Sequence, residues 1–231
     1  MLIEFLPSDK KVSDFVARPE SAKSNMPQWY KDLPAAGTKS CPVISNEGDI
    51  IRGLKSCTPF VDALTSGYIQ KTWCDIHIEF KDGHFNYKCG QEPIIMEHRD
   101  KVNVSLSDRY YPIEFAWLTP WIPRTPKGYS VLCTHPHNRL DLPFTTLTGI
   151  IDSDEFHHVG FGKFPFYIEK DFVGTIPAGT PMFQMTPFRR DNWESKEIKF
   201  EEKNQSKLEY TYFREFYNVY KNKFWKKKSY R

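Results

Sequence analysis

The sequence predicts a mostly β protein in which many short strands form a barrel or a sandwich. The chain of 231 residues contains 17 prolines spread over its whole length, so few uninterrupted stretches are long enough for a long helix. Several short stretches alternate apolar and polar residues between Pro- or Gly-containing turns. Closely spaced strands of this kind are typical of all-β sandwiches and barrels.

In the N-terminal region the apolar residues recur at neither the spacing of a helix nor that of a strand. Residues 1–50 are predicted to form an extended arm, and residues 51–205 a single β-rich domain. At the start of that domain, Thr58 as N-cap and Pro59 at the first helical position predict a short helix that ends before Gly67.

The stretch 73–80 alternates in polarity, with Ile76 and Ile78 on one side and charged residues on the other. A turn at Asp82 leads into residues 85–89, which alternate in the same way. This pattern predicts a β-hairpin with both isoleucines inward. Further strands are predicted over residues 94–97, 102–106, 113–117, 129–133, 164–168 and 182–185.

Residues 206–231 are predicted to form a basic amphipathic helix and tail. Aromatic residues recur there at three- and four-residue steps, at Phe213, Phe216, Tyr217, Tyr220 and Phe224, and the stripe is expected to dock on the sheet. The segment carries a net charge of +6, which leaves −3 for the rest of the chain. One interpretation is a solvated helix end, and the other is nucleic-acid binding through counterion release.

Composition narrows the class of protein. An aromatic content of 16% indicates a folded core. No apolar run approaches the roughly 20 residues needed to cross a bilayer, and the N-terminus lacks the features of a signal peptide. The 5 cysteines include no Cys-x-x-Cys pair and are interpreted as reduced, mostly buried thiols, so a cytoplasmic protein without a membrane partner is expected.

Polar residues are densest over residues 134–141 and 149–158, which hold four of the 7 histidines. His135, His137 and Asp141 are candidate ligands of a divalent metal, because a His-x-His pair on a strand places both rings on one face. The alternative is that these polar side chains line turns.

Two family resemblances meet in this region. The run Gly128, His135-Pro-His137, Asp141 and Gly149 resembles the first motif of the cupins, which implies a metal-dependent enzyme using His135 and His137. Cupins usually place Glu at the position of Asp141. The third histidine of that family is missing after Gly179, where Thr-Pro-Met follows.

The second resemblance is to the dUTPase and dCTP deaminase-like family, whose fold is a β-clip. It covers about residues 126–188. Pro-Lys-Gly at 126–128 resembles the family's entry into a strand, Gly-Ile-Ile-Asp-Ser-Asp at 149–154 its central segment, and the run at 176–184 its late glycine and glutamine motif. A β-clip in the C-terminal half is therefore implied.

This second resemblance also implies a ligand site. Asp152 corresponds to the carboxylate that holds the sugar 3′ hydroxyl, with Asp154 beside it, and Gln184 to the residue that helps orient the site. Arg139 is what remains of the phosphate-binding segment, and Phe156 is the displaced stacking aromatic. Because the phosphate-binding segment and the glycine-rich arm are lacking, no catalytic residue is assigned and dUTP hydrolysis is not expected.

Three further runs are Met-Pro-Gln-Trp-Tyr-Lys at 26–31, Cys-Thr-Pro-Phe-Val-Asp at 57–62 and Pro-Phe-Arg-Arg-Asp-Asn-Trp at 187–193. With them the whole chain resembles proteins carried by tailed phages, marine ones especially. This resemblance implies a viral origin and a location in the host cytoplasm or the virion.

The leading interpretation is an accessory protein that binds a small anionic or nucleotide-like ligand or a partner. One alternative is a structural protein of a virion or other assembly, which the N-terminal arm, the aromatic surface and the basic tail would suit. The other is a metal-dependent cupin-like enzyme. A second copy of the chain, in a homo-oligomer, is a further candidate partner.

Overall fold

The computed structural model describes residues 1–34, 36–37, 51–82, 84–90, 93–99, 108–158, 162–202, 205–206 and 220–231. The chain divides into two compact units. Unit 1 comprises residues 1–28, 63–190 and 230–231, and unit 2 comprises residues 29–62 and 191–229. The boundaries predicted at residues 50 and 205 remain predictions.

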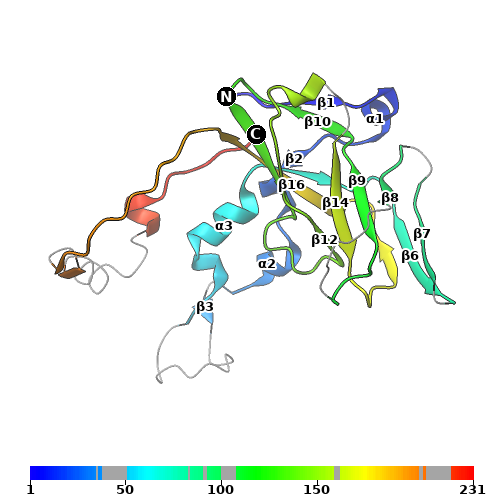
Figure 1. Ribbon diagram of the computed structural model, residues 1–231. Coiled ribbons are helices and arrows are strands. Elements are labelled where there is room, and N and C mark those ends of the chain that lie inside the picture. The colour runs from blue at the N-terminus through cyan, green and yellow to red at the C-terminus, as the bar shows by residue number, and fades with distance from the viewer. Residues whose placement is uncertain are drawn as a thin grey trace. The chain divides into compact units, whose positions relative to one another are not determined.

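Unit 1 consists mainly of antiparallel strands (Figure 1). These are β1 (Glu4–Pro7), β2 (Glu20–Ser21), β5 (Tyr68–Lys71), β6 (Ile76–Lys81), β7 (His84–Lys88), β8 (Met96–Arg99), β9 (Glu114–Leu118), β10 (Trp121–Arg124), β11 (Tyr129–Thr134), β12 (Phe144–Thr146), β13 (Gly149–Ile151), β14 (Lys163–Ile168), β15 (Gly174–Ile176) and β16 (Pro181–Arg189).

The strands of unit 1 form several separate sheets. Their orders are β13-β11-β16-β5-β2, β12-β14-β9-β8, β15-β6-β7 and β1-β10. Over the described residues none of these sheets closes on itself. The mostly β class is therefore confirmed as a set of antiparallel sheets.

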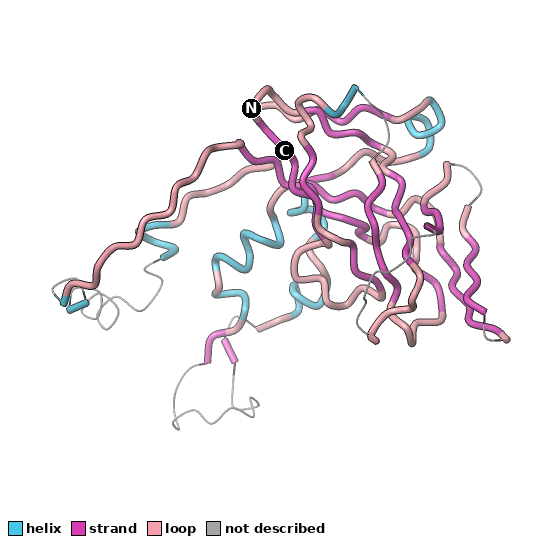
Figure 2. The backbone as a smooth tube through the Cα atoms, in the orientation of Figure 1, coloured by secondary structure: helices cyan, strands magenta, loops and turns pink. Residues whose placement is uncertain are grey.

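Helices are few and short, as Figure 2 shows. Those in the described part of the chain include α1 (Lys10–Phe15), α2 (Gln28–Asp32), α3 (Thr58–Thr65), 3₁₀ turns at Ala22–Asn25, Leu54–Ser56 and Phe156–His158, and a π-helical turn at Tyr220–Phe224. The predicted short helix is confirmed as α3, but it begins at Thr58 itself, which is thus its first residue and not its N-cap. Among the described helices, none has the length and apolar character that a membrane span requires.

The predicted hairpin is confirmed by the antiparallel pairing of β6 and β7, in which Ile78 lies opposite Tyr87 and Phe80 opposite Phe85. Ile76 and Ile78 are 0% and 1% exposed, so both point into the core. Asp82 adopts a φ of 53°, the left-handed conformation that a tight hairpin turn requires.

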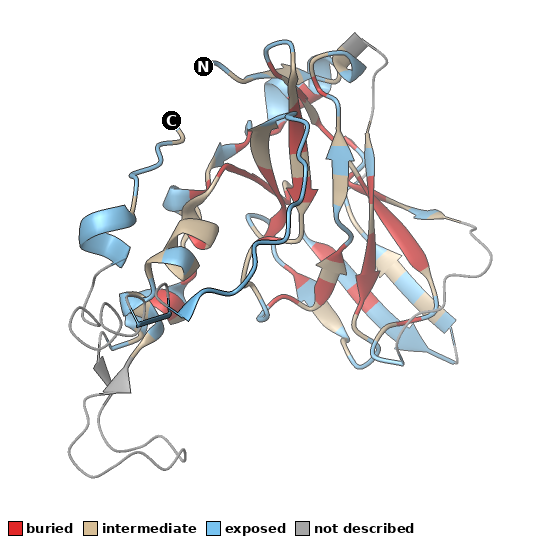
Figure 3. Cartoon of the chain, turned by 60° about the vertical axis from the view of Figure 1, so that its left-hand side comes forward, coloured by how far each residue is buried: buried red, intermediate tan, exposed pale blue. Residues whose placement is uncertain are grey.

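The hydrophobic core lies in unit 1 and draws on three of its sheets. Trp117 on β9 stacks on Phe166 of the neighbouring β14, with ring centroids 3.6 Å apart. From β14, Phe164 also contacts Phe183 of β16, at 4.8 Å. Figure 3 shows the buried residues concentrated on these strands, whose side chains join the isoleucines of β6 in one cluster.

Most of the other predicted strands are present, some of them with different bounds. The strands expected over 113–117, 129–133 and 164–168 appear as β9, β11 and β14, and the stretch 182–185 is the middle of the longer β16. The strand expected over 94–97 appears two residues later as β8. Residues 102–106 lie outside the described residues.

The first 28 residues contribute strands to unit 1, which the sequence analysis did not anticipate. β1 pairs with β10, with Glu4 opposite Arg124, and β2 pairs with β5. Both strands are very short, so the alternation of apolar and polar residues that marks a strand cannot be recognised in their sequences.

Unit 2 contains the two-stranded pair of β3 (Ala36–Gly37) and β4 (Ile51–Arg52). Tyr30 is buried and stacks on Phe60 at 5.9 Å. Of the predicted C-terminal stripe only Tyr220 and Phe224 are described, and they are 46% and 62% exposed. The expected docking of this stripe on the sheet is therefore not seen for its two described members.

The four described cysteines are free thiols, whereas Cys41 lies outside the described residues. Cys133 is buried, Cys74 and Cys89 are half-buried, and Cys57 is exposed. Of the four described thiols, only that of Cys133 is fully buried as expected.

Candidate functional site

Strand β13 leads directly into a tight turn that displays two of the predicted site residues. The carbonyl of Asp152 accepts hydrogen bonds from the N–H groups of Glu155 and Phe156, at 3.1 and 2.8 Å. Ser153, at the centre of this turn, is buried, and its hydroxyl hydrogen-bonds that of Thr125 at 2.7 Å. The buried Ser153 therefore holds the turn against the rest of unit 1, and Asp152 and Phe156 lie on the exposed side of the turn.

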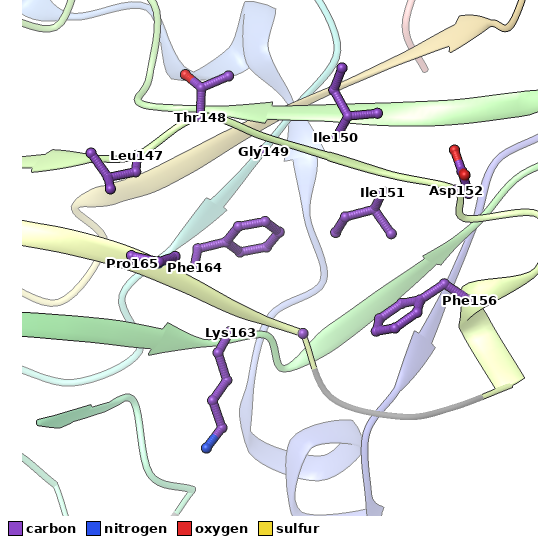
Figure 4. Close-up of a pocket in the computed structure, with 11 residues that line it drawn as sticks. Leu147, Thr148, Gly149, Ile150, Ile151, Asp152, Phe156, Lys163, Phe164 and Pro165 are labelled. Atoms are coloured by element: carbon purple, nitrogen blue, oxygen red, sulfur yellow. The ribbon is translucent and has the colours of Figure 1, made fainter. Parts of the chain in front are cut away.

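A pocket of about 640 Å³ lies beside this turn, between β13 and the start of β14 (Figure 4). The rings of Phe156 and Phe164 point toward each other across it, and Asp152 stands at one end. Most of its remaining lining is apolar as well, contributed by Leu147, Ile150, Ile151 and Pro165. The pocket thus combines apolar walls with a carboxylate at its end.

One carboxylate oxygen of Asp152 is engaged and the other is open. Oδ1 accepts a hydrogen bond from the Ser130 hydroxyl at 2.6 Å and lies 3.2 Å from Nη1 of Arg190. Oδ2 has no hydrogen bond or ion pair with the residues that the structure describes. The side chain is 64% exposed, so Oδ2 is available to a bound molecule.

Asp154 is held far more tightly, although it lies only two residues further on. Its side chain is 3% exposed and pairs with both terminal nitrogens of Arg190, and it accepts the N–H of Gly128 at 2.8 Å. The Arg190 hydrogen bonds hold the pKa of the Asp154 carboxyl well below its usual range, aided by Gly128 and opposed by burial.

The backbone N–H of Gly128 can donate to Asp154 because residue 128 adopts a φ of 83°. This conformation is readily adopted by glycine and is strained for other residues. Its carbonyl also accepts the backbone N–H of Arg190, at 2.9 Å. The ends of β11, β13 and β16 are therefore connected around one buried carboxylate, which orients Arg190 toward Asp152.

This ion pair predicts a specific dependence of stability on pH. An unfolded Asp has a pKa of about 3.9, and the folded-state pKa of Asp154 lies below that value. Its stabilisation is therefore complete above about pH 4 and is lost as the pH falls toward the folded-state pKa. We expect Asp154→Asn to lower the melting temperature at pH 7. Between about pH 4 and pH 2 the melting temperature of this variant should fall less steeply with decreasing pH than that of the wild type.

The matched control is Glu155→Gln, which removes an exposed carboxylate from the adjacent position. It should retain both the melting temperature and the steep decline in acid, as followed by circular dichroism. An Asp154→Asn protein that declines as steeply as the wild type would show that the ion pair does not stabilise the fold.

The candidate metal ligands have other partners. His135 is half-buried, its Nδ1 accepts the N–H of Thr146 at 3.3 Å, and Nε2 therefore carries the proton and donates to the carbonyl of Arg139 at 2.9 Å. Burial lowers the pKa of His135 and favours this neutral form. His137 Nδ1 donates to the carbonyl of Ala63 at 2.9 Å.

Asp141, the third candidate ligand, forms a two-point ion pair with Arg139, with both N···O distances 2.8 Å. Within the part of the chain that the structure describes, no group of three or more His, Cys, Asp or Glu side chains is arranged to hold a metal ion. The arrangement of these residues therefore favours the interpretation that they line turns.

Gln184 is buried, and its side-chain amide is hydrogen-bonded to the protein backbone. It is 1% exposed, its Oε1 accepts the N–H of His137 at 2.8 Å, and its Nε2 donates to the carbonyls of Ala63 and Ser66 at 3.0 and 2.5 Å. Its amide connects β16 to the end of α3 and to the turn after β11.

The predicted ligand set therefore separates into two groups. Gln184 lies opposite Thr134, whereas Asp152 contacts Ser130, four residues away along β11, or about 13 Å in an extended strand. Arg139 lies beyond the end of β11 and pairs with Asp141. Asp152 and Phe156 line the pocket, and Asp154 lies in the same turn but pairs with Arg190. Arg139 and Gln184 do not join them.

Sequence reasoning did not assign Arg190 to the site. Its only signal is that a cation follows a long apolar strand, and nothing local indicates which carboxylate it meets, because Asp154 is 36 residues away. His157 lies near the site, and its Nδ1 is 3.1 Å from the carbonyl of Ser153.

Fold and pocket together define the class: a β-rich protein with a pocket of small-molecule size beside β13. No protein-family model matches the sequence, and no curated protein is similar enough to indicate a relative. The assignment of a function therefore depends on the geometry of the pocket.

Proposed function

We propose that the protein is a β-clip-type binding protein whose pocket beside β13 takes a small nucleoside-like molecule without hydrolysing dUTP. The observation that carries the proposal is the largely apolar pocket of about 640 Å³ whose lining includes Asp152, a carboxylate that is 64% exposed. Residues 149–152, which belong to the segment that resembles the β-clip family, form one wall of this pocket and support the same interpretation.

The size and chemistry of the pocket fit a small molecule with a flat ring and hydroxyl groups. Pockets of about 300 to 1,000 Å³ with apolar walls and a few polar groups are typical of small-molecule sites. The ring of Phe156, which is 37% exposed, offers a face for stacking. Asp152 Oδ2 can accept a hydrogen bond from a sugar hydroxyl.

The charges near the pocket favour a nucleoside over a polyphosphate. Lys163 lines the pocket, but its ammonium group is 2.6 Å from Glu97. Arg190 is occupied by Asp154 and Asp152. A triphosphate would have to displace these pairs and approach the Asp152 carboxylate, so its extra negative charges should not strengthen binding.

The test is a thermal shift of the full chain with deoxyuridine, deoxyuridine monophosphate and dUTP. A ligand at ten times its Kd should raise the melting temperature by about 3 to 6 °C. We expect Asp152→Asn and Phe156→Ala to abolish this shift. The triphosphate should bind no more tightly than the nucleoside and should remain intact.

Glu155→Gln is the matched control, because it neutralises a carboxylate next to the pocket without altering its lining. It should keep the full shift. A melting-temperature shift in Asp152→Asn equal to that of the wild type would show that Asp152 is not part of the site. Conversion of dUTP to dUMP and pyrophosphate would overturn binding without hydrolysis.

A role as a structural protein of a phage virion is the second candidate. Residues 191–201 form no helix or strand and are exposed throughout, including Trp193, Ile198 and Phe200 at 88%, 84% and 73%. Large apolar side chains on an exposed segment are typical of surfaces that another subunit covers. Recovery of the protein in purified particles would support this role, and its absence from them would exclude it.

A further inference from the structure

In unit 2, the C-terminal segment is anchored to α3 by one carboxylate. The indole N–H of Trp225 donates to both oxygens of Asp62, at 3.1 and 2.8 Å. Lys228 forms an ion pair with the same carboxylate, and its ammonium group lies 5.8 Å from the centre of the Trp225 ring. Asp62 thereby fixes the segment at two positions.

The anchor leaves two aromatic rings accessible. Tyr220 and Phe224 are 46% and 62% exposed, and they are the first and last residues of the π-helical turn. Residues four positions apart on a helical turn lie on the same side of it. The two rings therefore present neighbouring flat surfaces, while Trp225 is held by Asp62.

The segment that carries these rings is itself rich in positive charge. Residues 220–231 contain six Lys or Arg and no Asp or Glu. Lys221, Lys226 and Lys227 are exposed and form no ion pair with described residues. Exposed lysines beside accessible aromatic rings form the combination that tracks a phosphate backbone and stacks unpaired bases.

We propose that the segment Tyr220–Ser229 of unit 2 binds single-stranded nucleic acid, with bases stacking on Tyr220 and Phe224 and phosphates meeting the lysines. Single strands fit better than duplexes, because base pairing and stacking hide the base faces that the rings need. The inference is independent of the pocket in unit 1, so failure of either proposal leaves the other standing.

An anionic membrane fits less well. Interfacial membrane binding places tryptophan and several apolar side chains together on one face of an amphipathic helix. Here the indole of Trp225 is tied through its N–H to a carboxylate. The apolar surface of the turn then consists of the two neighbouring rings of Tyr220 and Phe224, an arrangement suited to stacking.

The test is fluorescence anisotropy of the full chain with a labelled oligodeoxythymidylate of about 16 nucleotides. Neutralising four phosphates predicts a slope of about −3 for the logarithm of the association constant against that of the salt concentration. Phe224→Ala should weaken binding about 5- to 150-fold and leave the slope unchanged, because it removes stacking and no charge. Lys226→Gln with Lys227→Gln should reduce the slope.

Two matched controls lie in unit 1. Phe15→Ala removes a ring that is 74% exposed, and Lys81→Gln with Lys88→Gln removes two exposed lysines. Both proteins should bind as the wild type does. A far-ultraviolet circular dichroism spectrum and melting temperature equal to those of the wild type would show that Phe224→Ala is folded.

Three results would overturn the proposal. The first is no binding of the oligonucleotide at low salt. The second is an unchanged affinity in Phe224→Ala together with equal competition by polyglutamate, which would show unspecific charge attraction. The third is tighter binding to vesicles of phosphatidylcholine and phosphatidylserine than to the oligonucleotide, which would identify a membrane surface instead.

Discussion

Replacing Ile78 by Asp is expected to lower the free energy of unfolding by more than about 4 kcal/mol, enough to leave much of the chain unfolded at room temperature. Ile78 is 1% exposed on β6, with β7 on one side and β15 on the other. The new carboxylate would lose its hydration without gaining a cation, and the apolar contacts of the isoleucine would be lost as well. Thermal unfolding followed by circular dichroism measures the effect.

Lys81→Asp is the matched control, because it introduces the same carboxylate at the exposed end of the same strand. Its effect should stay within about 0.5 kcal/mol. If Ile78→Asp melted within a degree or two of the wild type, β6 would not belong to the core in solution.

Gly67→Ala is expected to cost about 3 to 5 kcal/mol, or a fall in melting temperature of about 6 to 20 °C. Gly67 ends the turn after α3 with a φ of +66°, and an added Cβ would lie 2.0 Å from the carbonyl oxygen of Met185. That oxygen belongs to the backbone of β16, so relief requires one of the two segments to move.

Gly179→Ala separates the two causes. Its φ of +87° imposes the same left-handed strain, but an added Cβ would meet nothing within 4 Å. The loss there should be only about 1 to 2 kcal/mol. Equal losses in the two variants would show that the close approach of Gly67 to β16 does not exist in solution.

Local pattern was sufficient to predict the main elements. The alternation around Ile76 and Ile78 predicts β6, β7 and the inward side of the hairpin, because side chains on a strand alternate between its faces. The short helix α3 was equally predictable from the threonine and proline at its start. In contrast, β1 and β2 have four and two residues, and they are strands only because β10 and β5 pair with them.

The candidate site was predictable where it is continuous in sequence. Asp152, Asp154 and Phe156 belong to one turn, so whatever positions one of them positions the others. Arg139 and Gln184 were grouped with them by family resemblance alone, and the register of β11 with β13 and β16 keeps Gln184 apart from Asp152. Register depends on packing over a whole sheet face, which no short motif encodes.

The sequence by itself determined the β-rich class, the inward and outward sides of its clearest hairpin and the concentration of positive charge near the C-terminus, because each is a property of neighbouring residues. Only the tertiary structure decided which groups meet: Arg190 with Asp154, His135 with Arg139 and Thr146, and Asp62 with Trp225. These partners are far apart along the chain or depend on a turn whose path is set elsewhere. Their pairing follows from the packing of strands and loops, since a buried polar group must find its partner within the fold.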